Sequence, residues 1–175
     1  MPGYAATEAA FYRLVDQRLG VDLQDPDRYN ASAWYDKNFK EGRERYRNSR
    51  SRIFPDVAEP PLPVPLPLED LTGTYFHPGY GNMTLKVARP ARDIPVAEGV
   101  EKVLHVDLEK ELTYALDWEH VSGLHFIIWL NLEDRTPMLR DAVPGEFVLG
   151  SDGKVVRLGA AIEPTLDQKI WFDKV

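Results

Sequence analysis

A proline-rich segment divides the chain and limits what can form on either side of it. Six prolines stand between Pro55 and Pro67, and residues 61–67 read PLPVPLP. Proline lacks an amide N–H and holds φ near one value, so neither a helix nor a central strand can include this stretch. We expect an extended strap whose leucines pack on the neighbouring domain; a docking site for a proline-reading module is the alternative.

Before the strap, residues 1–54 predict a helical arm. Thr7 can cap a first helix and Gly20 can end it in a left-handed conformation. A second helix begins near Asn30 or Ser32, and its arginines are interleaved with glutamates, which favours a solvated face over a phosphate site. The apolar stripes at helical spacing are Phe11, Leu14, Val15 and Leu19 in the first helix and Tyr35, Phe39, Gly42, Tyr46 and Ile53 in the second.

After Leu68 the pattern changes to a period of two residues, which indicates strands. Eight sequential antiparallel strands close most simply into an up-and-down barrel, because closure removes exposed edges. We therefore predict a mainly β fold with N-terminal helices: an arm at 1–54, a proline-rich linker at 55–67 and an eight-stranded antiparallel barrel at 68–175. A β-sandwich is the competing architecture. The predicted strands are 72–77, 81–88, 103–108, 113–118, 123–132, 145–149, 154–162 and 169–172.

Turn signals separate several of these strands. They stand at Pro78-Gly79, Ser122-Gly123, Pro144-Gly145 and Ser151-Asp152-Gly153. Asp152-Gly153 between two apolar runs predicts the clearest hairpin.

The charge balance argues against several classes of partner. The chain has 175 residues, no cysteine and a net charge of −7. Residues 1–54 carry 10 basic and 8 acidic side chains, a net of +2, and residues 55–175 carry 11 and 20, a net of −9. An acidic protein repels nucleic acid and anionic membranes. We therefore expect no binding to nucleic acid or to membranes. Because the sequence has no signal-peptide core and no run of eighteen apolar residues, we also expect a cytoplasmic protein.

Metal and cofactor chemistry find little support in the sequence. The four histidines are not paired at helical i, i+4 spacing, and without cysteine we expect no metal site. No glycine-rich loop leads from a predicted strand into a helix, so we expect no cofactor. His105 and Asp107 share one face of a predicted strand, but the flanking Lys102 and Glu109 favour solvent exposure over an acid/base dyad.

The predicted strand at 123–132 leaves two alternatives open. One of its faces is wholly apolar, and the other carries His125, Trp129 and Asn131. If the apolar face packs under the helices, these three residues line the barrel lumen and can orient a ligand. If the apolar face fills the barrel, which the pattern favours slightly, these three are surface residues and no site exists there.

Aromatic residues with polar tips suggest a pocket for a mostly apolar organic molecule. We name His125, Asp117 and Tyr75 as candidate catalytic acids or bases. The candidate ligand-binding residues are Tyr114, Trp118, Trp129 and Asn131. Residues 151–154 fit the S-x-x-K pattern of serine β-lactamases, but they bracket a hairpin turn, whereas that chemistry needs serine and lysine on one helical turn.

Four short stretches also carry a family resemblance: 71–81 (LTGTYFHPGYG), 118–123 (WEHVSG), 150–155 (GSDGKV) and 170–172 (IWF). Together they resemble the C-terminal barrel domain of fungal β-lactamase-related, penicillin-binding-protein-like serine hydrolases, over about residues 5–175. The resemblance implies a lipocalin-like barrel. It also implies that the catalytic serine and lysine belong to an upstream domain, so no catalytic residue is carried over to any position here.

Two functions follow from these observations. We predict a stand-alone barrel that binds a small hydrophobic intermediate of fungal secondary metabolism and acts on it as a cofactor-free cyclase or isomerase. This predicts a cavity of several hundred cubic ångströms in the barrel. The alternative is a non-catalytic accessory or C-terminal domain of a β-lactamase-related hydrolase, which predicts an exposed apolar patch on the N-terminal helices. A homodimer, or docking to a hydrolase domain, would use those helices.

Overall fold

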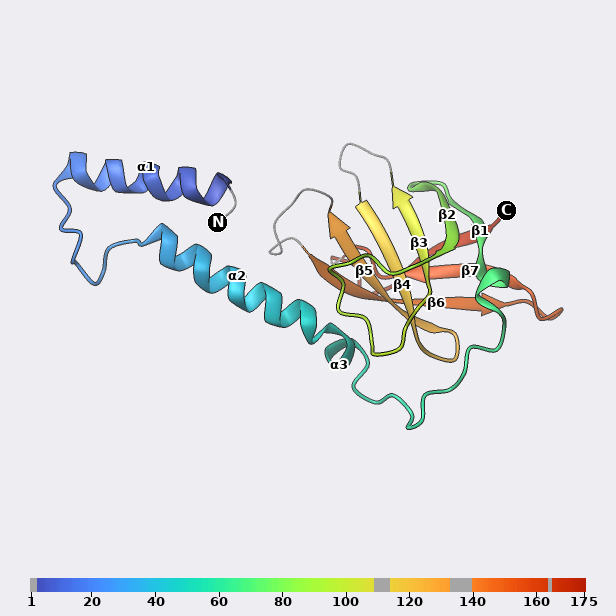
Figure 1. Cartoon of the computed structure of the whole chain (residues 1–175). Helices are drawn as coiled ribbons and strands as arrows, with labels where there is room; N and C mark the ends of the chain where they lie inside the picture. Colours follow the sequence, from blue (N-terminus) through green and yellow to red (C-terminus); the bar gives the residue numbers. More distant parts are fainter. Residues whose placement is uncertain (1–2, 109–113, 133–139, 164) are drawn as a thin grey trace.

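The computed structural model describes residues 3–108, 114–132, 140–163 and 165–175. Its strands form a closed barrel, and its helices form an arm that projects from one side (Figure 1). Each strand pairs antiparallel with the next, and β8 pairs with β1, so the predicted eight-stranded barrel is confirmed. The strands are β1 (Gly73–His77), β2 (Gly81–Ala88), β3 (Val103–Leu108), β4 (Tyr114–Ser122), β5 (His125–Leu132), β6 (Asp141–Leu149), β7 (Val155–Ala160) and β8 (Ile170–Lys174).

The arm consists of α1 (Gly3–Leu19), α2 (Ala31–Arg47) and the short α3 (Ser49–Ile53). Asn30 caps α2 by accepting a hydrogen bond from the Ala33 amide at 3.1 Å. Gly20 has φ +70° and ends α1 as predicted. The predicted cap at Thr7 is wrong, because α1 already extends from Gly3 and Thr7 lies inside it.

The proline-rich strap contains no helix or strand and follows a bent path from α3 to the start of the barrel (Figure 1). Leu62 is tied to the turn between β4 and β5: its amide donates to Ser122 Oγ at 3.0 Å, and its carbonyl accepts from the Gly123 amide at 2.9 Å. Val64 and Leu66 pack against the side chains that fill the barrel. A 3-10 turn, η1 (Leu68–Leu71), then leads into β1.

The apolar face of β5 points into the barrel. Phe126 and Ile128 belong to one buried cluster that the described strands contribute to the interior. This cluster contains Leu71, Tyr75, Met83, Leu85, Leu104, Val106, Leu116, Trp118, Phe126, Ile128, Phe147, Val155, Leu158, Ala160 and Phe172. Of the two alternatives for β5, the structure shows the one in which the apolar face fills the barrel.

A second buried cluster, which we call the outer core, lies on the outside of β4, β5 and β6. It consists of Tyr46, Ile94, Val121, Ile127, Trp129 and Ala142. Tyr46 comes from α2, and Ile94 comes from the segment 89–102 between β2 and β3. Trp129 therefore faces out of the barrel, yet it is fully buried because the base of the arm covers it.

Two strand predictions need correction. The pair Pro144-Gly145 is not a turn but lies inside β6, where Pro144 pairs with Ile127. A Cβ on Gly145 would lie 2.6 Å from Cζ3 of Trp118, so the close approach of this indole explains the glycine. The second correction is that β4 continues to Ser122 rather than ending at Trp118.

Candidate functional site

Glu119 on β4 is a fully buried carboxylate that joins the arm to the barrel. Its Oε1 accepts hydrogen bonds from Arg50 Nη1 at 2.6 Å and from the Ala97 amide at 2.9 Å. Its Oε2 accepts from the indole N–H of Trp129 at 2.8 Å. One side chain therefore holds α3, the segment 89–102 and β5 together. Extending the period-two pattern by one residue past 118 would have placed Glu119 on the same face as Asp117.

Asp117 repeats this arrangement two residues earlier on the same face of β4. It is also fully buried, and its carboxylate contacts His105 Nδ1 at 2.6 Å and accepts from the Ala91 amide at 3.2 Å. Asp117 lies opposite His105 on the neighbouring strand β3, so the two side chains meet across the sheet. Strand register decides this pairing, and the sequence carried no signal for it.

The candidate catalytic residues lie in three separate environments. Tyr75 is in the barrel interior and donates to the Leu71 carbonyl at 2.7 Å, and burial raises its pKa well above the ordinary value for tyrosine. Asp117 is outside the barrel under the segment 89–102. His125 is exposed at the start of β5, with Nδ1 3.5 Å from a carboxylate oxygen of Glu146. The structure therefore does not bring these three side chains together.

The candidate ligand-binding residues are also divided. Trp118 points into the barrel, whereas Trp129 belongs to the outer core. Asn131 faces outward and accepts a hydrogen bond from the Tyr46 hydroxyl at 3.1 Å. The side chain of Tyr114 lies outside the described residues. Trp118 and Trp129 are packed structural residues rather than the wall of one pocket.

Three pockets that the structure describes lie outside the barrel lumen. One, of about 370 Å³, lies between the strap and the start of β5 and includes Phe54, Leu62 and His125. A second, of about 470 Å³, lies between α2 and the segment 89–102. The third, of about 340 Å³, is on the arm.

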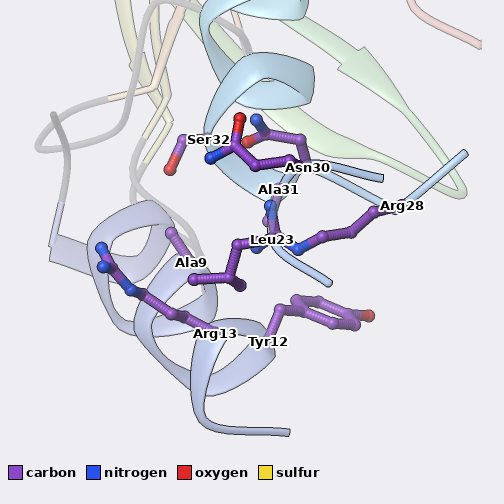
Figure 2. A pocket seen from close by; sticks show the side chains of 9 residues that line it. Ala9, Tyr12, Arg13, Leu23, Arg28, Asn30, Ala31 and Ser32 are labelled. Atoms are coloured by element: carbon purple, nitrogen blue, oxygen red, sulfur yellow. The ribbon is translucent and has the colours of Figure 1, made fainter. Parts of the chain in front are cut away.

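The arm pocket lies between α1, the loop that follows it and the start of α2. Figure 2 shows Leu23 at its centre, with the side chains of Arg13 and Arg28 on either side of it. Arg28 is held there by Asp16, whose Oδ2 lies 2.5 Å from Arg28 Nε. The Tyr35 hydroxyl donates to Glu8, which fastens α1 to α2.

The arm exposes large apolar side chains to solvent. Phe11 is 59% exposed and Leu14 65%, and as residues three apart they are neighbours on the surface of α1. Of the eleven exposed large apolar residues in the described chain, six lie within the first 34 positions: Phe11, Leu14, Leu19, Leu23, Tyr29 and Trp34. The small residues Ala5 and Ala31 are buried instead, so α1 presents much of its apolar surface outward. More than half of the exposed large apolar side chains of the described chain therefore belong to the arm.

We expect stability to fall in mild acid because of His120. Burial lowers the pKa of this imidazole below its ordinary 6.5; nearby Arg50 lowers it further, and a hydrogen bond to the Gly123 carbonyl at 3.1 Å opposes the shift. Between the pKa of His120 in the folded protein and about 6.5, the unfolded chain binds more protons than the folded protein does. The contribution of His120 to stability is therefore complete above about pH 6.5 and is lost as the pH falls from there through the pKa of the folded protein. Melting temperatures from pH 8 to 5 should fall less steeply for His120→Gln. Equal slopes for the variant and the wild type would refute this role of His120.

Two further features are absent from the described ranges. No group of three or more histidine, aspartate or glutamate side chains there is placed to hold a metal ion. No described helix is long and apolar enough to cross a membrane.

Fold and site together define an eight-stranded antiparallel barrel with a helical arm locked to its outer wall. The chain belongs to the family described as Domain of unknown function (DUF3471), which matches residues 58–174. No solved structure matches the sequence.

Two curated relatives match almost the whole chain. It is 31% identical to an unguisins hydrolase of Aspergillus campestris over 98% of this chain and 29% of the relative. It is 28% identical to an unguisins hydrolase of Aspergillus violaceofuscus over 94% of this chain and 27% of the relative. The chain therefore spans less than a third of the length of these relatives, and the match includes the arm as well as the barrel.

Proposed function

We propose that the chain is a non-catalytic accessory domain of a β-lactamase-related serine hydrolase, and that it docks on the catalytic domain through its arm. The observation that carries this proposal is the exposed apolar surface of α1 and α2, centred on Phe11 and Leu14. The accessory function predicted such a patch from the sequence. Removing these side chains from water is the main source of free energy on which docking would depend.

The rigid attachment of the arm supports the same function. Tyr46 of α2 packs edge to face on Trp129 with ring centroids 5.1 Å apart, and Arg50 of α3 bonds to the buried Glu119. These contacts set the direction in which the base of the arm leaves the barrel. A surface held in advance loses less conformational entropy on docking than a flexible one.

The relatives add a second line of support. They are named as hydrolases, and the region shared with this chain is less than a third of their length. A hydrolase domain in the remaining part would be the natural partner for the arm. The cyclase or isomerase function gains no such support, since the candidate acids and bases are separated and the inward side chains pack on one another.

Docking predicts that exposed apolar residues of the arm act as binding anchors. The test uses the chain as one partner and, as the other, the A. campestris hydrolase without the region that matches this chain, with binding followed by calorimetry. We expect Phe11→Ser/Leu14→Ser to weaken binding by about 10- to 100-fold, because each anchor contributes on the order of 1–2 kcal/mol. Its melting temperature should stay close to that of the wild type, since both side chains are exposed.

Val156→Ser is the matched control. Val156 is 40% exposed on β7, on the barrel rather than the arm, and its replacement should leave binding unchanged. Equal weakening by the control and the arm variant would contradict docking through the arm. Absence of binding to the corresponding parts of both Aspergillus hydrolases would contradict the accessory function itself.

A further inference from the structure

The second pocket, between α2 and the segment 89–102, concentrates positive charge in an acidic protein. Its lining includes four arginines from three separate parts of the chain: Arg43, Arg47, Arg92 and Arg140. Asp93 is the one carboxylate among the described residues that line it. The described part of the lining therefore holds four arginines and one aspartate, in a chain whose net charge is −7.

Most of this positive charge has no partner within the described chain. Arg43, Arg47 and Arg92 are exposed and make no ion pair there; the guanidinium carbon of Arg43 lies 5.8 Å from the centroid of the Phe39 ring. Exposed arginines usually spread apart, because like charges repel. Placing these around one concavity is unfavourable unless an anion balances them.

Arg140 is fixed at one side of the pocket and keeps a spare donor. Its Nη1 and Nη2 donate to the carbonyl and carboxylate of Asp93 at 3.3 and 3.4 Å, so Asp93 is already engaged. Its Nε is buried and has no hydrogen-bond partner among the described residues. Behind the pocket-lining Tyr46, Asn131 accepts a hydrogen bond from its hydroxyl. The Nδ2 of Asn131 is also buried and has no hydrogen-bond partner among the described residues.

The neighbouring carboxylates are also engaged elsewhere. Asp141 lies 3.4 Å from Arg52, and Asp117 lies 2.6 Å from His105. The hydroxyl of Tyr46 stays protonated, since burial raises its pKa well above the ordinary value, so no further negative charge arises there near neutral pH. The pocket wall therefore offers donors and positive charge.

From this arrangement we infer that the pocket binds a small, multiply charged oxyanion, a phosphorylated or polycarboxylate metabolite. Guanidinium groups match both kinds of oxyanion, because their planar donors bind two oxygens at once. A volume of about 470 Å³ suits a small molecule rather than a single inorganic ion. Ile94 and Pro95 give the pocket an apolar side against which the carbon skeleton of such a molecule can pack. This site is independent of the docking surface on α1.

The test measures binding of pyrophosphate and of citrate to the whole chain by calorimetry at constant ionic strength. The variant Arg47→Gln/Arg92→Gln removes two exposed arginines of the pocket, and we expect its affinity to fall about tenfold or more. The control Arg45→Gln/Arg89→Gln removes two exposed arginines from the same two segments but outside the pocket. It should change affinity less than about twofold, because it alters only long-range attraction that salt screens.

Each result has a defined meaning. Tighter binding of pyrophosphate assigns the site to phosphorylated molecules, and tighter binding of citrate assigns it to polycarboxylates; both support the inference. Equal losses in the two double variants would overturn it, since general attraction between charges would then explain the binding. Binding of neither anion to the wild type would also overturn it. All of these readouts are independent of a hydrolase partner, so failure here and failure of the docking proposal are distinguishable.

Discussion

Replacing Glu119 with alanine will cost about 3 kcal/mol of folding free energy, because it leaves several buried groups without their partner. Arg50 loses its carboxylate, and the N–H groups of Trp129 and Ala97 lose their acceptor. Arg50 is still 31% exposed, so water recovers part of the loss, which places the cost at the lower end of the range for buried ion pairs. Urea denaturation followed by tryptophan fluorescence measures the change.

Two variants give this measurement its meaning. Glu119→Gln keeps an acceptor for Trp129 but removes the charge that Arg50 needs, so it should cost less than alanine. Glu69→Ala breaks the exposed ion pair with Lys102 at 3.6 Å and should cost well under 1 kcal/mol. If Glu119→Ala lowered the free energy of unfolding no more than Glu69→Ala, the buried carboxylate of Glu119 would not be what holds the arm to the barrel.

Trp118→Ala should cost about 3–5 kcal/mol, the usual range for truncating a buried aromatic side chain. Trp118 is fully buried in the barrel, and its ring centroid lies 5.6 Å from that of Phe147. Its indole N–H has no hydrogen-bond partner among the described residues, so the loss comes from packing. Trp171→Ala, which removes a partly buried indole on the outside of β8, should cost less.

The contact between Trp118 and Gly145 allows a second measurement of the same packing. Gly145→Ala alone should cost about 1–3 kcal/mol, because the added carbon would lie 2.6 Å from Trp118 and 2.8 Å from Ile128. In the Trp118→Ala background the nearer clash is gone, so the same substitution should cost less. Strict additivity of the two changes in denaturation experiments would contradict a packed interior at this position.

Glu119 also links two parts of the fold that are packed separately. The barrel has its own packed interior, whereas the outer core exists only where the arm and the segment 89–102 cover β4 and β5. Loss of the Glu119 carboxylate should therefore loosen the arm before the barrel. If the arm is the docking surface, such a variant would bind a hydrolase partner more weakly even where the barrel stays folded.

Local chemistry alone determined much of this protein. Proline in the strap, glycine at the end of α1 and the period-two pattern after Leu68 act through the backbone or through alternation of faces, and they predicted the strap, the arm and the eight strands. The turn predicted at Pro144-Gly145 was one exception. A glycine is needed there because the side chain of Trp118, a residue distant in sequence, lies too close for a Cβ. No local signal distinguishes a glycine of this kind from a glycine in a turn.

The candidate site depended on tertiary structure instead. Strand register paired His105 with Asp117, and the covering arm buried Trp129 on the outside of the barrel. Folding also brought Arg47, Arg92 and Arg140 around one pocket, although the glutamates between the α2 arginines had favoured a solvated face. A single sequence shows which side chains share a strand or helix face, but not which other element that face meets. The meeting of distant elements decided which polar groups here are buried, paired or exposed.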